Sequence, residues 1–221
     1  MTKNQIAYDI LSLFYKGETT DDTNLVLPQI KYWIDITRSK LIRNSINKGQ
    51  SINPDIIQTI ECLNVEIVDA SECNCEKSGC VIQRTSLKLP TTIETNQSNL
   101  LLNVSTSLIP GKPFTIIPFS RAPYIKAGKF TNKGNIAFLH NKYLYILSDV
   151  LFDKISVSAV FQNPEDLKYF KSCSSKNCYS EDSEYPMSNH MIDDLKKMVF
   201  DTNYRIYFNS QEDDINDSAG K

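Results

Sequence analysis

The sequence predicts an α+β fold with an N-terminal helical hairpin, a central and mainly antiparallel β region of sandwich or barrel type, a C-terminal helix and a flexible acidic tail. Two observations lead to this prediction. Apolar residues recur at helical spacing near both ends of the chain, whereas the middle contains short alternating or apolar runs separated by proline, glycine and asparagine. The boundaries that follow are 1–50 for the hairpin, 51–161 for the β domain, 162–208 for the C-terminal helical segment and 209–221 for the tail.

The first helix of the hairpin is predicted within residues 4–15. Ile6, Ile10, Leu13 and Phe14 lie on one face at helical spacing, and Gly17 follows where a helix stop is expected. This pattern is typical of a short amphipathic helix.

A second, longer helix of about five turns is predicted to follow, with capping side chains at 21–23 and a stop at Gly49. Pro28 is compatible with a position near its start. One side of this helix should be buried and the other should carry basic residues. The buried stripe consists of Ile30, Trp33, Ile34, Thr37, Leu41 and Ile42, and the basic surface consists of Lys31, Arg38, Lys40, Arg43 and Lys48.

The β region begins with the segment IIQTIECLNVEIVDA at 56–70, in which Leu63, Val65 and Ile67 alternate with polar residues. We expect Cys62 in this strand to belong to the core. Further short runs are TSLKLP, FTIIPF, NIAFLH, KYLYIL and ISVSAVF, and the stretch NIAFLHNKYLYIL predicts a hairpin whose turn lies near His140, Asn141 and Lys142.

The C-terminal part predicts a short helix, a loop and a last helix. The segment QNPEDL places a proline and acidic residues where a helix starts, and KSCSSKNCYSEDSEYP has the composition of a loop. Ser188 and Asn189 can cap the last helix, whose apolar face carries Met191, Ile192, Leu195, Met198 and Val199. The residues after it have little to bury, which predicts a flexible tail.

Composition indicates a globular protein with 41% hydrophobic and 23% charged residues. The net charge of −2 provides no overall basic field that would attract nucleic acid or an anionic membrane. We find neither a signal peptide nor an apolar run of about 20 residues, so we expect no membrane contact and synthesis in a cytoplasm. In such a reducing compartment the six cysteines are expected to be thiols or metal ligands rather than disulfides.

The cysteines are the weak candidates for a metal site. Cys73, Cys75 and Cys80 lie in the segment CNCEKSGC, and Cys173 and Cys178 lie in a second loop. Four thiolates from these loops would suit zinc, but the spacing lacks the paired C-x2-C arrangement of common zinc sites. We therefore expect no metal and no cofactor, and we keep a zinc-containing nucleic-acid-binding module as the alternative function.

No enzyme motif is present. The chain has two histidines, no G-x-S-x-G sequence and no glycine-rich phosphate loop. We therefore predict no catalytic residues and no enzymatic activity.

Residues 111–133 combine basic and aromatic side chains without an acidic residue. One interpretation is a long loop that its aromatic residues anchor to the core. The other is a surface that contacts the phosphates of a duplex in a channel, or a neighbouring subunit. The basic residues of this segment are Lys112, Arg121, Lys126, Lys129 and Lys133.

The order of several stretches resembles neck proteins of crAss-like bacteriophages. These stretches are DILSLFYKGETTDD followed by LPQI and a long helix, then ISVSAVFQNPEDL, and YPMSNHMIDDLKKMVF leading into EDDINDSAGK. The resemblance implies a head-to-tail connector in the virion neck or tail, assembled in the cytoplasm of the bacterial host. It also implies a homo-oligomeric ring, twelve-fold in this family, that contacts the portal protein and other neck or tail ring proteins and continues the DNA channel.

Overall fold

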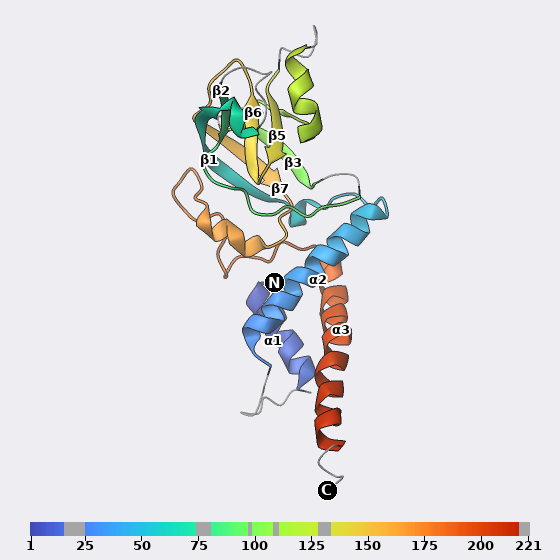
Figure 1. Ribbon diagram of the computed structural model, residues 1–221. Helices are drawn as coiled ribbons and strands as arrows, with labels where there is room; N and C mark the ends of the chain where they lie inside the picture. The colour runs from blue at the N-terminus through green and yellow to red at the C-terminus, as the bar shows by residue number, and fades with distance from the viewer. Residues whose placement is uncertain (16–24, 74–80, 97–98, 108–110, 128–133, 217–221) are drawn as a thin grey trace. The chain divides into compact units, whose positions relative to one another are not determined.

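The computed structural model of the chain describes residues 1–15, 25–73, 81–96, 99–107, 111–127 and 134–216, without the side chains of 125–127 and 204–216. The chain forms two compact units (Figure 1). The helical unit comprises Met1–Ile56 and Glu181–Lys221, and the β unit comprises Ile57–Ser180. The α+β prediction is confirmed, and residues 162–180 belong to the β unit.

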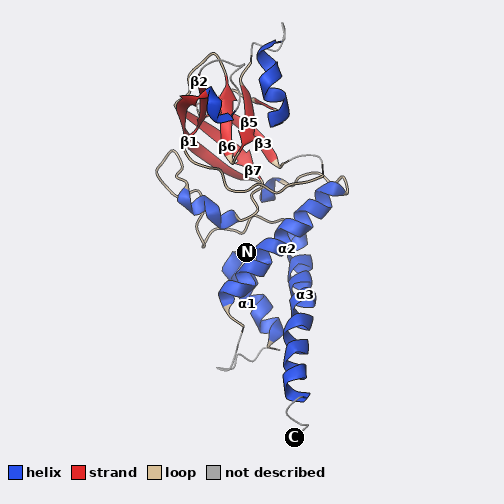
Figure 2. Ribbon diagram, in the orientation of Figure 1, coloured by secondary structure: helices blue, strands red, loops and turns tan. Residues whose placement is uncertain are grey.

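The helical unit contains the helices α1 (Lys3–Phe14), α2 (Leu27–Asn47) and α3 (Asn189–Asn216). The short 3-10 helix η1 (Pro54–Ile56) follows α2 in the chain. The three long helices pack against one another around an apolar core (Figure 2). The predicted stripes supply much of this core, which contains Ile6, Ile10, Phe14, Ile30, Ile34, Ile192, Leu195 and Val199.

The helix ends follow local capping rules in part. The Thr2 hydroxyl accepts the N–H of Gln5 and the Gln5 side chain accepts the N–H of Thr2, so α1 begins with a capping box. α2 begins at Leu27 without a side-chain cap, and the predicted caps at 21–23 lie outside the described residues. Gly49 follows α2 with a φ of 82°, a conformation that glycine adopts without strain.

α3 is longer than the sequence analysis predicted. It continues to Asn216, into the segment from 209 that was expected to be a flexible tail. No glycine or proline interrupts these residues, so no helix-breaking residue ends α3 before the tail.

Charged side chains lie inside the helical unit. Lys3 of α1 donates to Asp35 of α2 at 2.7 Å, and the hydroxyl of Tyr185 donates to the other oxygen of the same carboxylate at 2.8 Å. Arg38 was expected on the basic surface of α2, but it is fully buried, because its Nε donates to the carbonyl oxygen of Pro186 at 2.8 Å. Its guanidinium also lies 5.6 Å from the ring centroid of Tyr185. These contacts connect α1, α2 and the segment before α3.

The β unit is built on one seven-stranded sheet with the order β3-β7-β1-β2-β6-β5-β4. All neighbours are antiparallel except β4 and β5, which are parallel. The strands are β1 (Gln58–Asp69), β2 (Val81–Thr85), β3 (Leu101–Thr106), β4 (Thr115–Ile116), β5 (Ile136–His140), β6 (Tyr143–Leu147) and β7 (Lys154–Ala159).

The two edge strands of this sheet approach each other. The N–H of Phe114, just before β4, donates to the carbonyl of Val104 in β3 at 2.8 Å, and the N–H of Thr106 donates to the carbonyl of Lys112 at 3.1 Å. The sheet therefore curls into a near-barrel, and these hydrogen bonds protect edges that would otherwise be open to pairing with other chains. Of the two predicted forms, the barrel-like one is confirmed.

Two apolar clusters lie on opposite faces of the sheet. The interior of the near-barrel contains residues such as Leu63, Leu144 and Val157. The second cluster includes Phe138 and Tyr145, and the 3-10 helices η2 (Ala70–Cys73) and η4 (Phe119–Ala127) contribute to it. Alternation along the strands sends neighbouring side chains to different clusters.

The predicted hairpin is confirmed as β5 and β6. Asn141 and Lys142 form its two-residue connection with φ values of 50° and 67°, as a turn with two left-handed residues requires. The predicted short helix after Phe161 is the 3-10 helix η5 (Pro164–Tyr169), capped by the Asn163 side chain, which accepts the N–H of Glu165. Among the described residues, no helix combines the length and apolar character needed to cross a membrane.

Candidate assembly site

The basic and aromatic segment 111–133 is anchored to the β unit by two phenylalanines. Phe114 is buried and packs edge-on against Phe152, with ring centroids 5.1 Å apart. Phe119, at the start of η4, stacks on the imidazole of His140 at 4.0 Å. Tyr124 of η4 is 70% exposed and takes no part in this anchoring. The first interpretation of the segment therefore holds for its aromatic residues up to Phe119.

The basic side chains of this segment fall into three groups. Lys112 is exposed at the end of the β3–β4 connection, where its N–H donates to the Thr106 hydroxyl at 2.9 Å. Arg121 is exposed on η4, and neither side chain forms a salt bridge within the described part of the chain. Lys126, Lys129 and Lys133 lie outside the described side chains, so the grouping of all five remains a prediction.

The cysteines differ from the expectation that all are thiols or metal ligands. Cys62 forms a disulfide with Cys173, with their Cα atoms 5.0 Å apart. A bulge in β1 between Ile60 and Leu63 lets both of those residues enter the core. Cys62 lies within this irregularity and is half-buried, so it is available to Cys173 and is not the core residue that was predicted.

The remaining cysteines do not assemble into a metal site within the described residues. Cys73 is buried and disulfide-bonded, so its sulfur, 3.5 Å from the carbonyl oxygen of Ala70, has no proton to donate. Burial raises the pKa of the free thiol of Cys178, an effect that outweighs a backbone hydrogen bond from Glu61. Cys75 and Cys80 lie outside the described residues, and the described part of the chain contains no cluster of three or more potential metal ligands.

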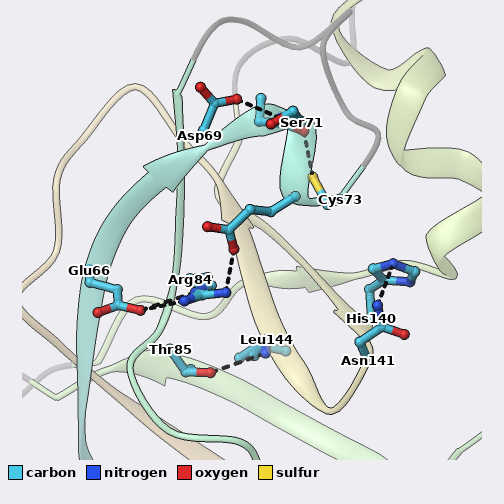
Figure 3. Close-up of polar contacts among 11 residues, drawn as sticks. Glu66, Asp69, Ser71, Cys73, Arg84, Thr85, His140, Asn141 and Leu144 are labelled. Atoms are coloured by element: carbon cyan, nitrogen blue, oxygen red, sulfur yellow. Dashed lines mark hydrogen bonds and ion pairs between the residues drawn. The ribbon is translucent and has the colours of Figure 1, made fainter.

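Ionic contacts fasten η2 to the sheet. Arg84 of β2 donates to Glu66 of β1 at 2.9 and 3.0 Å (Figure 3). It also pairs with Glu72 of η2. Its guanidinium lies 4.3 Å from the ring centroid of Tyr143, on the neighbouring hairpin. Both carboxylates are therefore engaged by one arginine, which is an arrangement for holding elements together rather than for proton transfer.

An exposed group of aliphatic residues lies at one end of the β unit, and the sequence analysis missed it. Ile67, Val81 and Leu151 line one shallow depression of about 100 Å³, and Val150 adjoins them; we call these four residues the apolar patch. Ile67, Val81 and Leu151 are 57%, 67% and 70% exposed, respectively. Alternation in β1 had suggested that Ile67 is buried, but β1 extends past the core, a property that the period of two cannot reveal.

Comparison with known proteins identifies one family. The family model described as phage tail ring protein 2 matches residues 5–220. The chain matches no curated protein sequence.

Proposed function

Because the chain belongs to the phage tail ring protein 2 family of crAss-like phages, we propose that it is the subunit of a homo-oligomeric connector ring between the portal and the tail. The family match carries this proposal because it covers both units. Members are structural components of the phage tail, so the chain is a structural virion protein and not an enzyme. In the proposed position the ring continues the channel through which the genome passes.

The exposed apolar residues of the helical unit support a role in assembly. Tyr32 and Ile36 are one turn apart on α2 and both are exposed. Tyr8 is exposed on α1, and so is Leu13, which the helical spacing had wrongly placed on the buried face. Large exposed apolar side chains that gather on a surface mark sites that partner proteins cover. We assign the face of α2 that carries Tyr32 and Ile36 to contacts with the portal protein or an adjacent ring protein.

The near-barrel supports the same proposal from a different direction. Its edge strands are joined by backbone hydrogen bonds, so subunits cannot associate simply by extending the sheet from one copy to the next. Contacts that the β unit makes with other copies then involve side chains on its faces. Such contacts can fix one geometry and hence close a ring.

Cryo-electron microscopy of purified phage particles tests the proposal. We expect a ring of density between portal and tail into which both units of this chain fit, with the twelve-fold symmetry that the resemblance implies. A ring of this chain farther along the tail would refute the connector position. Absence of the chain from particles that contain the portal would refute the function itself.

A further inference from the structure

We propose that the apolar patch forms one half of the contact between neighbouring copies of this chain, and that the face of η4 carrying Arg121 and Tyr124 forms the other half. This inference rests on the proposed ring function. It assigns two different surfaces of the β unit to a heterologous contact, in which one surface of each copy meets the other surface of the next copy.

The patch lies where two strands of the sheet separate. The hydrogen-bonded pairing of β2 with β6 consists of Gln83 with Ile146 and Arg84 with Tyr145. Val81 lies beyond these pairs, and Ile67 of β1 is paired with Gln83 of β2. The depression that Ile67, Val81 and Leu151 line is therefore set into the end of the sheet, where a side chain of another protein can enter.

A buried glutamine holds the most exposed residue of the patch in place. The side-chain amide of Gln83 donates to the carbonyl of Val150 at 2.8 Å and accepts the N–H of Phe152 at 2.8 Å. Leu151 lies between these two fixed backbone positions and is 70% exposed. An exposed leucine on a fixed backbone loses little freedom when it is buried by a partner, which favours binding.

Three aspartates border the apolar patch, and their charge favours a basic partner surface. Asp149 and Asp153 flank the patch along the chain, and Asp69 pairs with Val81 across β1 and β2. The Asp69 carboxylate accepts the N–H of Ser71 at 2.8 Å, and all three aspartates are exposed. Lys154 is the basic residue beside them.

The complementary surface is the basic segment of the same chain. Residues 95–148 contain no aspartate or glutamate. Within them, η4 carries the exposed Arg121 and, three residues later, the 70% exposed Tyr124, a spacing that puts both on one side of a 3-10 helix. An aromatic ring with an adjacent arginine suits an apolar patch with an acidic rim, because both residue types are enriched in protein interfaces.

The two surfaces lie on opposite faces of the sheet, so one copy can contact a different neighbour with each of them. Ile67 and Val68 are consecutive in β1, so their side chains point to opposite faces. Val68 packs in the cluster that contains Ala122 of η4, whereas Ile67 belongs to the exposed patch. If the apolar patch of one copy contacted the same patch of another copy, assembly would stop at a dimer. A contact between two different surfaces can instead repeat around a ring.

Cross-linking in phage particles tests the geometry. Particles carry Leu151→Cys together with Tyr124→Cys in a Cys178→Ser background and are treated with a short bismaleimide. We expect a ladder of covalent multimers from the double variant and none from either single variant or from the Cys178→Ser chain alone. Dimers of the Leu151→Cys single variant that peptide mapping shows to be joined between the two substituted sites would indicate a symmetric contact and overturn the proposal. A double variant without a ladder, as expected if η4 faces the DNA, would also overturn it.

A charge placed in the patch tests its contribution to assembly. Leu151→Asp should lower incorporation of the chain into particles by at least about tenfold, because it replaces the most exposed apolar side chain of the patch by a carboxylate that must lose its water. Leu87→Asp is the matched control, since Leu87 is also an exposed leucine of the β unit but does not line the patch. Circular dichroism of both purified variants establishes that each is folded.

The outcomes separate this inference from the proposed function. If the native chain and the Leu151→Asp variant enter particles equally, the contact is wrong and the ring function stands. If the native chain is absent from particles, the proposed function fails first.

Discussion

The Asp35→Ala substitution removes a carboxylate on which two parts of the helical unit converge. Its oxygens accept hydrogen bonds from the Lys3 ammonium at 2.7 Å and from the Tyr185 hydroxyl at 2.8 Å. The side chains of Lys3 and Asp35 are only 4% and 15% exposed. The substitution therefore deprives a buried ammonium of this counter-charge while the lysine remains enclosed.

Breaking a buried ion pair by removing one partner typically costs about 3–5 kcal/mol. The partial exposure of Asp35 places our expectation at the lower end, so we predict a loss of about 3 kcal/mol in the free energy of unfolding. With a urea dependence of about 1–3 kcal/mol per molar, the unfolding midpoint should fall by roughly 1–3 M.

Trp33 provides the assay. It is the single tryptophan of the chain and packs, partly buried, against the core of the helical unit, with its ring centroid 6.3 Å from that of Phe14. Its fluorescence during urea titration therefore follows this unit, while far-ultraviolet circular dichroism follows both units. A shift of the fluorescence transition alone would locate the destabilisation in the helices.

Two further variants show whether the buried charge is the cause. Asp9→Ala breaks the more exposed pair between Asp9 and Lys196 in the same unit and should cost less than about 1 kcal/mol. Lys3→Met combined with Asp35→Leu removes both charges and should recover most of the loss. The reasoning is refuted if Asp35→Ala costs no more than Asp9→Ala, or if the double variant is as unstable as the single one.

Three further predictions concern the β unit. Gln83→Leu keeps the side-chain volume but leaves two backbone groups of the 150–152 loop without their partner, so the free energy of unfolding in urea should fall by about 2 kcal/mol. An unchanged unfolding midpoint would show that the two Gln83 hydrogen bonds do not stabilise the loop. Reduction of the Cys62–Cys173 disulfide, or its replacement by two serines, should destabilise the unit by roughly 2–4 kcal/mol in urea titrations followed by circular dichroism, because the bond closes a long loop; equal midpoints with and without reductant would argue against it. The pKa of the Cys178 thiol is raised, so in the folded chain this thiol loses its proton at a higher pH than an unfolded cysteine does. Iodoacetamide should therefore label Cys178 more slowly at pH 8 in the native than in the urea-unfolded chain, and the native rate should rise toward alkaline pH. Equal labelling rates, measured by peptide mass mapping, would show that burial does not protect the thiol.

Local patterns predicted most of the fold. Helical spacing identified the faces of α1 and α2, and the NIAFLHNKYLYIL pattern identified the β5–β6 hairpin, because these features depend on residues close together in sequence. Arg38 was missed because its partner, the Pro186 carbonyl, is distant in sequence and belongs to the segment before α3. A basic residue on a helix normally indicates solvent, and only the tertiary structure reveals a buried acceptor.

The candidate surfaces were only partly predictable. The basic residues of 111–133 are evident from composition. The patch at Ile67 and Leu151 is not, because it depends on the point at which β1 extends beyond the core and on the hydrogen bonds by which Gln83 holds a loop that is distant in sequence. The Cys62–Cys173 bond was missed for a different reason. The expectation of a reducing cytoplasm argued against disulfides, and six cysteines at irregular spacing do not define their pairing.

The disulfide between Cys62 and Cys173 determines what a proteolytic cut does to this protein outside the cell. The bonded residues are 111 positions apart, and the chain between them contains β2 to β7 in full. If a protease cuts any single peptide bond in this interval, the two fragments stay covalently joined. A tail subunit nicked in a surface loop would thus keep its near-barrel attached to its helices, and the cut would become visible only after the sample is reduced.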